Sequence, residues 1–362
     1  MTSRTATAWN AAPQLAPQNY VSGSVYTDPA IFAAERRQIF GRLWTLVAHA
    51  SEFPEPFAFR TTEQGAGPVL LLREADGSIA AYANVAAPGR VAEVRSTGTE
   101  ARWAGGAGLT RLRCESKLDL VFVCWDADAP SLENFLGATL DAFAEPMAPG
   151  ELEVIHFHRA TLQSNWKAWM ETNLDAYHTF MHVVLRKTQV DSARRIRIQP
   201  NGHAAGGGLK ANYSNYKGWQ DRSNDLALAG MDATDMRSGH LFPNAMVLAR
   251  GTVIRLDTII PLTPDTMILE CRGLGRNGDS DAARRMRFQH HNMYWGPLSR
   301  NLPEDAFAAE ACARSFDSGA GRWQIIARDE NLTGQDDGML RNFYGEWSRR
   351  LGRPAHNPVN QG

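Results

Sequence analysis

Two histidines and one aspartate near the middle of the chain are the residues whose types and spacing best suit metal chemistry. His178 and His182 are four positions apart, and Asp175 lies three positions before His178. On an α-helix, residues three or four apart share a face, so the three side chains would meet if this segment is helical. Two imidazoles and a carboxylate are a ligand set that suits divalent iron or zinc. The spacing alone leaves a second interpretation open, with one histidine buried and hydrogen-bonded and the other exposed.

The residues around this pair extend the pattern from position 165 to position 182. This segment resembles the mononuclear-iron motif of the Rieske-type ring-hydroxylating oxygenases. That motif runs Asn-Trp-Lys, then Glu-Asn, then an acid, then Tyr-His, and then a second histidine. The matching residues here are Asn165, Trp166, Lys167, Glu171, Asp175, Tyr177, His178 and His182. The family usually has four residues between its histidines, whereas this chain has three.

The family's third iron ligand is a carboxylate far downstream, after a Gly-Pro pair and near the start of a helix. Gly296-Pro297 and Asp305 match that arrangement. The resemblance therefore implies an iron(II) site made by His178, His182 and Asp305, with open positions for dioxygen and substrate. The adjacent Glu304 is an alternative third ligand.

The region that should hold the family's two-iron Rieske cluster lacks the ligands. In the family, a strand ending in Asn-Val runs into Cys-x-His, and Cys-x-x-His follows about twenty residues later. Here Asn84-Val85 is followed by Ala86 and Pro88 at the first Cys and His positions, and the second pair is absent. Cys114 has no histidine near it in sequence. We therefore expect no [2Fe–2S] cluster and no iron–sulfur ligands in this chain.

The missing cluster raises the question of where electrons come from, because iron(II) that activates dioxygen needs them. In the family, an acid at the position of Asp175 connects the cluster of one subunit to the iron of the next, so the resemblance implies a catalytic role for Asp175. Electrons would then arrive in trans, from a ferredoxin, a reductase or a Rieske-bearing subunit. The family assembles as trimers, and a homo- or hetero-trimer or hexamer is expected here.

Four large apolar residues are candidates for the substrate pocket: Phe180, Met181, Met293 and Trp295. In the family, the residue just before the Gly-Pro pair lines the pocket, and Trp295 has that place. An apolar pocket implies a small organic substrate, such as an aromatic compound, that is mono- or dioxygenated. The alternative is that these residues are ordinary core packing.

The elements that must position these residues follow from apolar periodicity and turn residues. Helices are expected at 28–41, 130–143, 165–182, 279–293, 303–316 and 337–351. Strands are expected at 44–49, 68–73, 79–85, 109–113, 120–125, 153–161, 245–256 and 266–271, with a hairpin turn at Asp76-Gly77. Asp336 and Asp337 are interpreted as acids at the start of the last helix.

These elements indicate an α+β fold with a long antiparallel sheet. We expect a loose N-terminal arm over 1–22 and a degenerate Rieske-like β domain with an opening helix over 23–148. A mononuclear-iron catalytic domain over 149–362 follows. The resemblance implies that this second domain has the helix-grip (Bet v 1-like) architecture.

The composition suits a globular protein: of 362 residues, 43% are hydrophobic and 21% charged, with a net charge of −1. A charge so near zero gives no general attraction to nucleic acid or to a membrane surface. The longest apolar runs are too short to cross a bilayer, and the N-terminus lacks the order of a signal peptide. The four cysteines are scattered, so a reducing cytoplasm is expected.

Three functions remain open from the sequence. In the first, the chain is a catalytic oxygenase subunit that receives electrons from another protein. In the second, it is a non-catalytic companion of a complete oxygenase subunit. In the third, it is a different metal enzyme, or a hydrophobic-ligand binder, on the same scaffold. Iron content separates the first from the second, and product formation with and without a reductase separates the first from the third.

Overall fold

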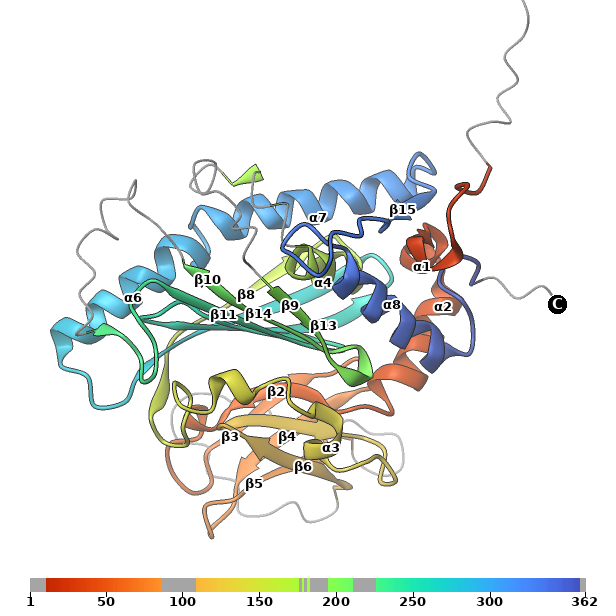
Figure 1. The fold of residues 1–362 in the computed structure, drawn as a ribbon. Coiled ribbons are helices and arrows are strands. Elements are labelled where there is room, and N and C mark those ends of the chain that lie inside the picture. Colours follow the sequence, from red (N-terminus) through yellow and green to blue (C-terminus); the bar gives the residue numbers. More distant parts are fainter. Residues whose placement is uncertain are drawn as a thin grey trace, which may run out of the picture.

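The structure is a computed structural model that describes residues 11–85, 109–175, 178, 181–182, 195–210 and 226–358. Two large antiparallel sheets form its body (Figure 1). The seven-stranded sheet crosses the middle, with helices over one face and the six-stranded sheet beneath the other. The predicted mixture of helices with a long antiparallel sheet is confirmed.

The six-stranded sheet has the order β2-β7-β6-β5-β4-β3. Its strands are β2 (Thr45–His49), β3 (Phe59–Glu63), β4 (Pro68–Arg73), β5 (Ile79–Ala83), β6 (Arg111–Lys117) and β7 (Leu120–Cys124). The hairpin predicted between β4 and β5 is present. Gly77 has φ 87°, and the Asp76 carboxylate accepts a hydrogen bond from the backbone N–H of Ser78 at 2.9 Å.

The opening helix begins where the sequence predicts. Asp28 caps α2 (Pro29–Glu35) by accepting from the backbone N–H of Ala30 at 2.7 Å, and Pro29 occupies the first helical position. A π-helical turn, Arg36–Phe40, continues it. The short helix α1 (Ser24–Thr27) precedes it. The chain then enters β2 of the six-stranded sheet.

The seven-stranded sheet has the order β8-β14-β13-β12-β11-β10-β9. Its strands are β8 (Leu152–Leu162), β9 (Arg195–Ile198), β10 (Ala204–Lys210), β11 (Asp235–Leu241), β12 (Ala245–Ala249), β13 (Ile254–Thr263) and β14 (Thr266–Arg276). A small separate pairing joins β1 (Tyr20–Ser22) to β15 (Trp323–Ile325). Short 3-10 turns lie at Pro17–Asn19, Ala50–Glu52, Asp141–Phe143 and Pro200–Gly202.

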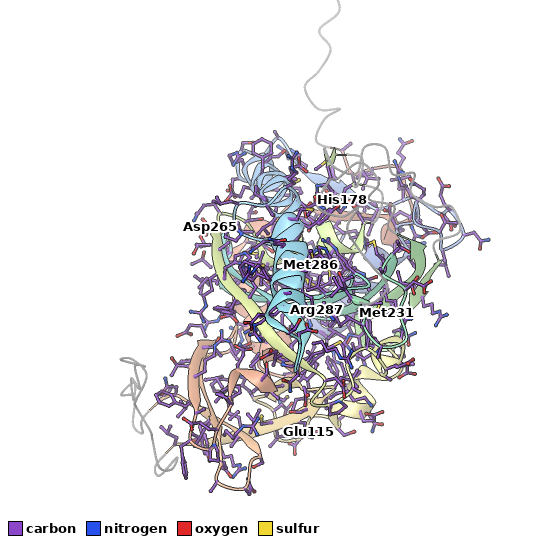
Figure 2. All side chains as sticks on the ribbon, turned by 90° about the vertical axis from the view of Figure 1, so that its left-hand side faces the viewer. Glu115, His178, Met231, Asp265, Met286 and Arg287 are labelled. Carbon is purple, nitrogen blue, oxygen red and sulfur yellow. The ribbon has the colours of Figure 1, made fainter. Side chains whose placement is uncertain are left out.

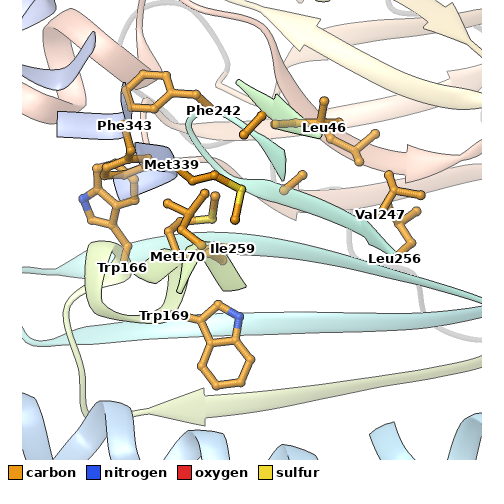
Figure 3. Packing of buried hydrophobic residues seen from close by; sticks show 14 of the residues in the cluster. Leu46, Trp166, Trp169, Met170, Phe242, Val247, Leu256, Ile259, Met339 and Phe343 are labelled. Atoms are coloured by element: carbon orange, nitrogen blue, oxygen red, sulfur yellow. The ribbon is translucent and has the colours of Figure 1, made fainter. Parts of the chain in front are cut away.

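Helices lie over the upper face of the seven-stranded sheet in Figure 1. They include α4 (Trp166–Leu174), α6 (Asp281–Trp295), α7 (Asn301–Asp317) and α8 (Gly338–Leu351). The main hydrophobic core includes residues of these helices and of the seven-stranded sheet, and it extends to β2 and β7 of the six-stranded sheet. Figure 3 shows Trp166 and Met170 of α4 packed with Phe343 of α8 and Ile259 of β13.

Three predicted elements differ from the structure. The helix expected over 130–143 is only α3 (Leu132–Leu136) and a 3-10 turn, because Gly137 takes φ 51° and breaks the chain direction. The strand expected over 245–256 is two strands, separated by a turn at Gly251 with φ 62°. The helix expected over 165–182 ends at Leu174, because Asp175 is extended.

A buried arginine ties the two layers together. Arg272 of β14 is fully buried, and its guanidinium donates to Glu52 and to Glu270, each at 2.7 Å, and to the backbone oxygen of Val47 at 3.2 Å. These partners come from both sheets, so the layers are held in one orientation. Among the described residues, no helix is both long and apolar enough to cross a membrane.

Candidate metal centre

Asn165 starts helix α4, which leads into the predicted metal-binding residues. Its side chain accepts a hydrogen bond from the backbone N–H of Lys167 at 3.0 Å, as an N-cap residue does. Its amide nitrogen donates to the backbone oxygens of Tyr26 at 3.0 Å and Pro264 at 2.6 Å. One side chain thus begins the helix and attaches it to the N-terminal segment and to the β13–β14 turn.

A buried carboxylate, Glu35 of α2, fixes the next turn of α4. Lys167 Nζ lies 2.7 Å from Glu35 Oε1, and both side chains are fully buried. The indole N–H groups of Trp166 and Trp347 donate to the same carboxylate at 2.8 Å and 2.7 Å. The Asn-Trp-Lys segment therefore holds α4 against α2 and α8.

The next residue of the motif, Glu171, is buried one turn further along α4. The hydroxyl of Tyr26 donates to its carboxylate at 2.5 Å, and the hydroxyl of Tyr344 donates to the same oxygen. Burial raises the pKa of Glu171 to about 7, although the two hydroxyls and Lys167 oppose this shift. Glu171 thus ties α4 to α1 and α8.

Replacing Lys167 by methionine is expected to lower the free energy of unfolding by about 3–5 kcal/mol, because it leaves the Glu35 charge buried without its partner. Urea unfolding followed by tryptophan fluorescence measures the change. The double variant Glu35→Gln/Lys167→Met removes both charges and should recover part of the loss. A loss below about 1 kcal/mol in the single variant would contradict the anchoring role.

His178, His182 and Asp305 converge beyond the C-terminal end of α4. The Nε2 atoms of His178 and His182 lie 3.4 Å and 3.2 Å from Asp305 Oδ1. One ligand-type atom from each residue lies within 4.8 Å of the other two. Figure 2 shows His178 beyond the end of α6, the helix that carries Met286 and Arg287.

The histidines are not part of the single long helix that the sequence predicts. Both follow the end of α4, which stops at Leu174. Asp305 comes from the second turn of α7, close to its predicted position near a helix start. Both imidazoles face the carboxylate of Asp305 on α7.

Each histidine is oriented by a carboxylate at its other ring nitrogen. His178 Nδ1 lies 2.5 Å from Asp175 Oδ1, and His182 Nδ1 lies 2.7 Å from Glu304 Oε2. These contacts fix both imidazoles with Nε2 directed at Asp305, an arrangement typical of metal-binding histidines. Glu304, the alternative ligand, here contacts the far side of a histidine.

The charges at this centre favour a deprotonated acid beside the imidazoles. Burial acts against a charged His178, but the carboxylates of Asp175 and Asp305 beside it raise its pKa to about 10. Burial acts against ionised Asp305, yet the facing imidazoles of His178 and His182 lower its pKa to about 2. Without a bound metal ion, these contacts therefore favour the protonated form of His178.

The residues present fit a divalent metal ion. Asp305 Oδ1 is buried and has no hydrogen-bond partner of good geometry among the described residues, although two imidazole nitrogens face it. A cation between the three side chains would satisfy that oxygen and both nitrogens. Two imidazoles and one carboxylate, with other positions open, are the donor set of non-haem iron(II) oxygenases.

The four pocket candidates fall in different environments. Phe180 lies outside the described residues. Met181 is 38% exposed, whereas Met293 is partly buried against the main core. Trp295 is fully buried, and its indole N–H donates to the carboxylate of Asp257 at 2.9 Å. A polar group therefore lies beside Trp295, which the prediction of an apolar pocket does not include.

Asp336 and Asp337 lie in the turn before α8 and outside the metal-ligand group. The Asp336 carboxylate accepts from the backbone N–H groups of Glu330 at 2.8 Å and Leu332 at 2.9 Å. Asp337 is the N-cap residue of α8, and its carboxylate accepts from the backbone N–H of Arg328 at 2.8 Å. Their place at the start of the last helix agrees with the prediction.

Sequence reasoning missed the polar residues that lie beside Trp295. Arg255 and Asp257 are both buried on β13, and the Arg255 Nη2 donates to Asn173 of α4 at 2.9 Å. A signal was present, because two charges two positions apart interrupt an otherwise apolar strand and must share one face. Nothing in the sequence shows that this face meets α4.

The two cysteines of the N-terminal layer lie on opposite faces of their sheet. Cys114 of β6 packs with the small core of that layer, whereas Cys124 of β7 belongs to the main core. They pair with neighbouring positions, Cys114 with Val123 and Cys124 with Arg113. Alternate residues of a strand point in opposite directions, so these two thiols cannot bind one cluster together.

Comparisons with known proteins agree with this geometry. The family model described as "Ring hydroxylating alpha subunit (catalytic domain)" matches residues 149–353. The chain is 35% identical to the 2-aminobenzenesulfonate 2,3-dioxygenase subunit alpha of Alcaligenes sp., over 96% of this chain and 98% of that one. It is 30% identical to the methanesulfonate monooxygenase hydroxylase subunit alpha of Methylosulfonomonas methylovora, over 99% and 97%.

Solved structures share the fold at lower identity. The naphthalene 1,2-dioxygenase from Rhodococcus sp., bound to indole, superposes with a TM-score of 0.73 and 18% identity, covering 92% of this chain and 94% of that one. A quaternary ammonium Rieske monooxygenase superposes with a TM-score of 0.70 and 17% identity, covering 96% and 100%. The chain belongs to the family of ring-hydroxylating oxygenase α subunits, the Rieske-type non-haem iron oxygenases.

Proposed function

We propose that this protein is the catalytic subunit of an oxygenase that binds one iron(II) through His178, His182 and Asp305. The supporting observation is the convergence of these three side chains, which match the ligand types of the family motif although the two histidines are one residue closer in sequence. Iron bound there would supply the open coordination positions at which dioxygen and the substrate react. The chain's own contribution is to hold the two imidazoles in fixed orientations.

The groups around the centre have separate tasks in this proposal. The carboxylates of Asp175 and Glu304 accept hydrogen bonds from the Nδ1–H groups of His178 and His182. The Nε2 atoms of both imidazoles are then available to bind metal. Asp305 carries the negative charge that balances the cation. Burial of His182 and Asp305, which are 2% and 5% exposed, limits the access of water.

We further propose that the chain holds no Rieske cluster and receives its electrons from another protein. The ligand positions after Asn84-Val85 carry no Cys or His, and Cys114 and Cys124 lie on opposite faces of one sheet. The alignment with the Alcaligenes relative spans 388 positions, more than the 362 residues of this chain, so that relative has segments without a counterpart here. The layer over 23–148 is then a degenerate Rieske-like domain, and 149–362 is the helix-grip catalytic domain.

Purified protein is expected to lack the visible absorption of a Rieske centre, because four cluster ligands cannot be assembled from this sequence. Absorption spectra, together with acid-labile sulfide and iron determinations, measure this directly. About one iron and no sulfide per chain is the expected result. Stoichiometric sulfide would contradict the proposal for the cluster but leave the mononuclear site untouched.

The proposed substrate is a small organic sulfonate. The Alcaligenes and Methylosulfonomonas relatives, at 35% and 30% identity, are both named for sulfonates, one aromatic and one aliphatic. Product formation from benzenesulfonate and methanesulfonate, with and without a reductase and a Rieske-type electron donor, tests the activity. Turnover that requires the donor supports an oxygenase supplied in trans. Iron-free protein without turnover would instead indicate a companion subunit in a trimer or hexamer.

A further inference from the structure

The starting observation is a buried arginine on the helix-covered face of the seven-stranded sheet. Arg255 of β13 is 4% exposed. Its Nε donates to Asp257 Oδ2 at 2.7 Å, and its Nη2 donates to the same oxygen and to Asn173 at 2.9 Å. In the described part of the chain, Nη1 has no hydrogen-bond partner. Hydrogen bonds from Nε and Nη2 thus fix the guanidinium, and Nη1 remains available to a ligand.

Arg255 contacts the predicted pocket residue Trp295 and the end of α4, the helix that leads to the metal centre. Its guanidinium carbon is 3.0 Å from the centroid of the Trp295 ring. Its partner Asn173 is two residues before Asp175, whose carboxylate contacts His178. A group bound at Nη1 would therefore lie in the same interior region as the end of α4 and the end of α6.

A set of neutral imidazoles lies beside this arginine. His156, Gly273 and Arg255 occupy one row across β8, β14 and β13. A Cβ at Gly273 would lie 2.7 Å from the ring of His291, so the ring of His291 occupies the space above that glycine. The rings of His291 and His156 are 4.9 Å apart, and the rings of His156 and His158 are 5.2 Å apart.

These imidazoles have ring nitrogens without hydrogen-bond partners among the described residues. They are Nδ1 of His156, both nitrogens of His158 and Nε2 of His291, and all four atoms are buried. Burial lowers the pKa of His156 to about 4 and that of His291 well below its usual value. A neutral imidazole can donate one N–H, so His156, His158 and His291 offer hydrogen-bond donors as well as acceptors. Buried polar groups without partners mark a place where a polar ligand can bind.

We propose that Arg255 binds the anionic head group of the substrate, with the imidazole row as supporting donors, and that it sets the preference for sulfonates. This rests on the proposed function for the substrate class, but it assigns the recognition to residues outside the metal-ligand group. Asp257 and Asn173 position the guanidinium, and Trp295 supports it from one side. The apolar part of the substrate would extend toward the metal centre.

The chemistry of this site favours a sulfonate over a carboxylate. A sulfonate has three equivalent oxygens, which can accept from Nη1 and from imidazole N–H groups in several directions. It stays singly charged and does not take a proton from a neighbour. A carboxylate has two oxygens in one plane and matches a guanidinium best when both of its terminal nitrogens are available. Here Nη2 is already bound to Asp257 and Asn173.

Ligand binding to the metal-free protein tests this inference separately from catalysis. Benzenesulfonate, benzoate and benzyl alcohol serve as probes, and calorimetry or quenching of tryptophan fluorescence gives the dissociation constants. The wild-type protein is expected to bind benzenesulfonate more tightly than the other two. Arg255→Met should weaken benzenesulfonate binding roughly 10- to 100-fold, the range for losing hydrogen bonds to a charged group, and should leave benzyl alcohol binding within about threefold.

Arg159→Met is the matched control, because Arg159 is half-exposed on the edge strand β8 of the same sheet and contacts Glu270. It should leave all three dissociation constants unchanged. Arg255→Lys keeps the charge and guards against a folding defect. It should bind benzenesulfonate more weakly than the wild type and lose the preference over benzoate.

Two results would overturn the inference. One is a wild-type protein that binds iron but shows no preference for benzenesulfonate, which leaves the proposed metal site standing. The other is an Arg255→Lys or Arg255→Met variant that is folded by circular dichroism and binds benzenesulfonate as tightly as the wild type. A sulfonate preference in a protein that retains no iron would support Arg255 and contradict the proposed oxygenase function instead.

Discussion

The variant His178→Ala is expected to retain no iron and to show no oxygenase activity. His178 is one of two imidazoles that face the single carboxylate of Asp305, and no other described histidine or acid completes a metal-ligand group there. Loss of an outer-shell partner alone lowers metal affinity by about 10- to 100-fold, so loss of a ligand should exceed that range. Iron content after dialysis and the affinity for iron(II) under anaerobic conditions measure the effect.

Two aspartate variants serve as comparisons for this experiment. Asp305→Asn should lose iron as His178→Ala does, because it removes the charge that both imidazoles face. Asp337→Asn changes an acid in the turn before α8, outside the ligand group, and should keep iron at the wild-type level. Iron loss in the Asp337 variant with retention in the Asp305 variant would mean that the wrong C-terminal acid has been assigned.

The sequence is sufficient to predict which three residues meet, but not how they meet. The motif pattern identifies His178, His182 and Asp305, and a Gly-Pro pair locates the last of these. The expectation of one helix over 165–182 is wrong, because α4 ends at Leu174. A single extended residue, Asp175, ends the helix, and its conformation depends on contacts that the local sequence does not encode.

Residues that act through tertiary contacts are the ones that the sequence leaves without a role. Glu304 is adjacent to Asp305, so chemistry alone makes it a rival ligand, and only the geometry directs it at His182 Nδ1. In the sequence, Arg255 is one of two charged residues in an otherwise apolar strand, and only the fold places Asn173 of α4 and Trp295 of α6 beside it. Distances across a fold depend on packing, whereas a motif records only residue types and spacing.

The variant Asp175→Asn is expected to keep its iron but to lose most of its turnover with an electron donor. Asparagine keeps an oxygen that can accept from His178 Nδ1, so the imidazole should stay in place. The carboxylate side chain is 23% exposed, so it can also meet a partner at the surface. Loss of its charge should reduce donor-driven turnover by about 10- to 100-fold, as for other outer-shell carboxylates.

The structure supplies a matched control for Asp175 in Glu304, which contacts Nδ1 of the other histidine and is 28% exposed. If both acids only orient and polarise an imidazole, Asp175→Asn and Glu304→Gln should reduce turnover alike, whether electrons come from a protein donor or oxidation is driven by added peroxide. If Asp175 also couples the iron to a donor, its variant should lose donor-driven turnover while keeping the peroxide-driven reaction, and Glu304→Gln should lower both together. Equal activity of Asp175→Asn and wild type in both assays would remove any electron-transfer role for Asp175, and the acid would then serve the ligand histidine alone.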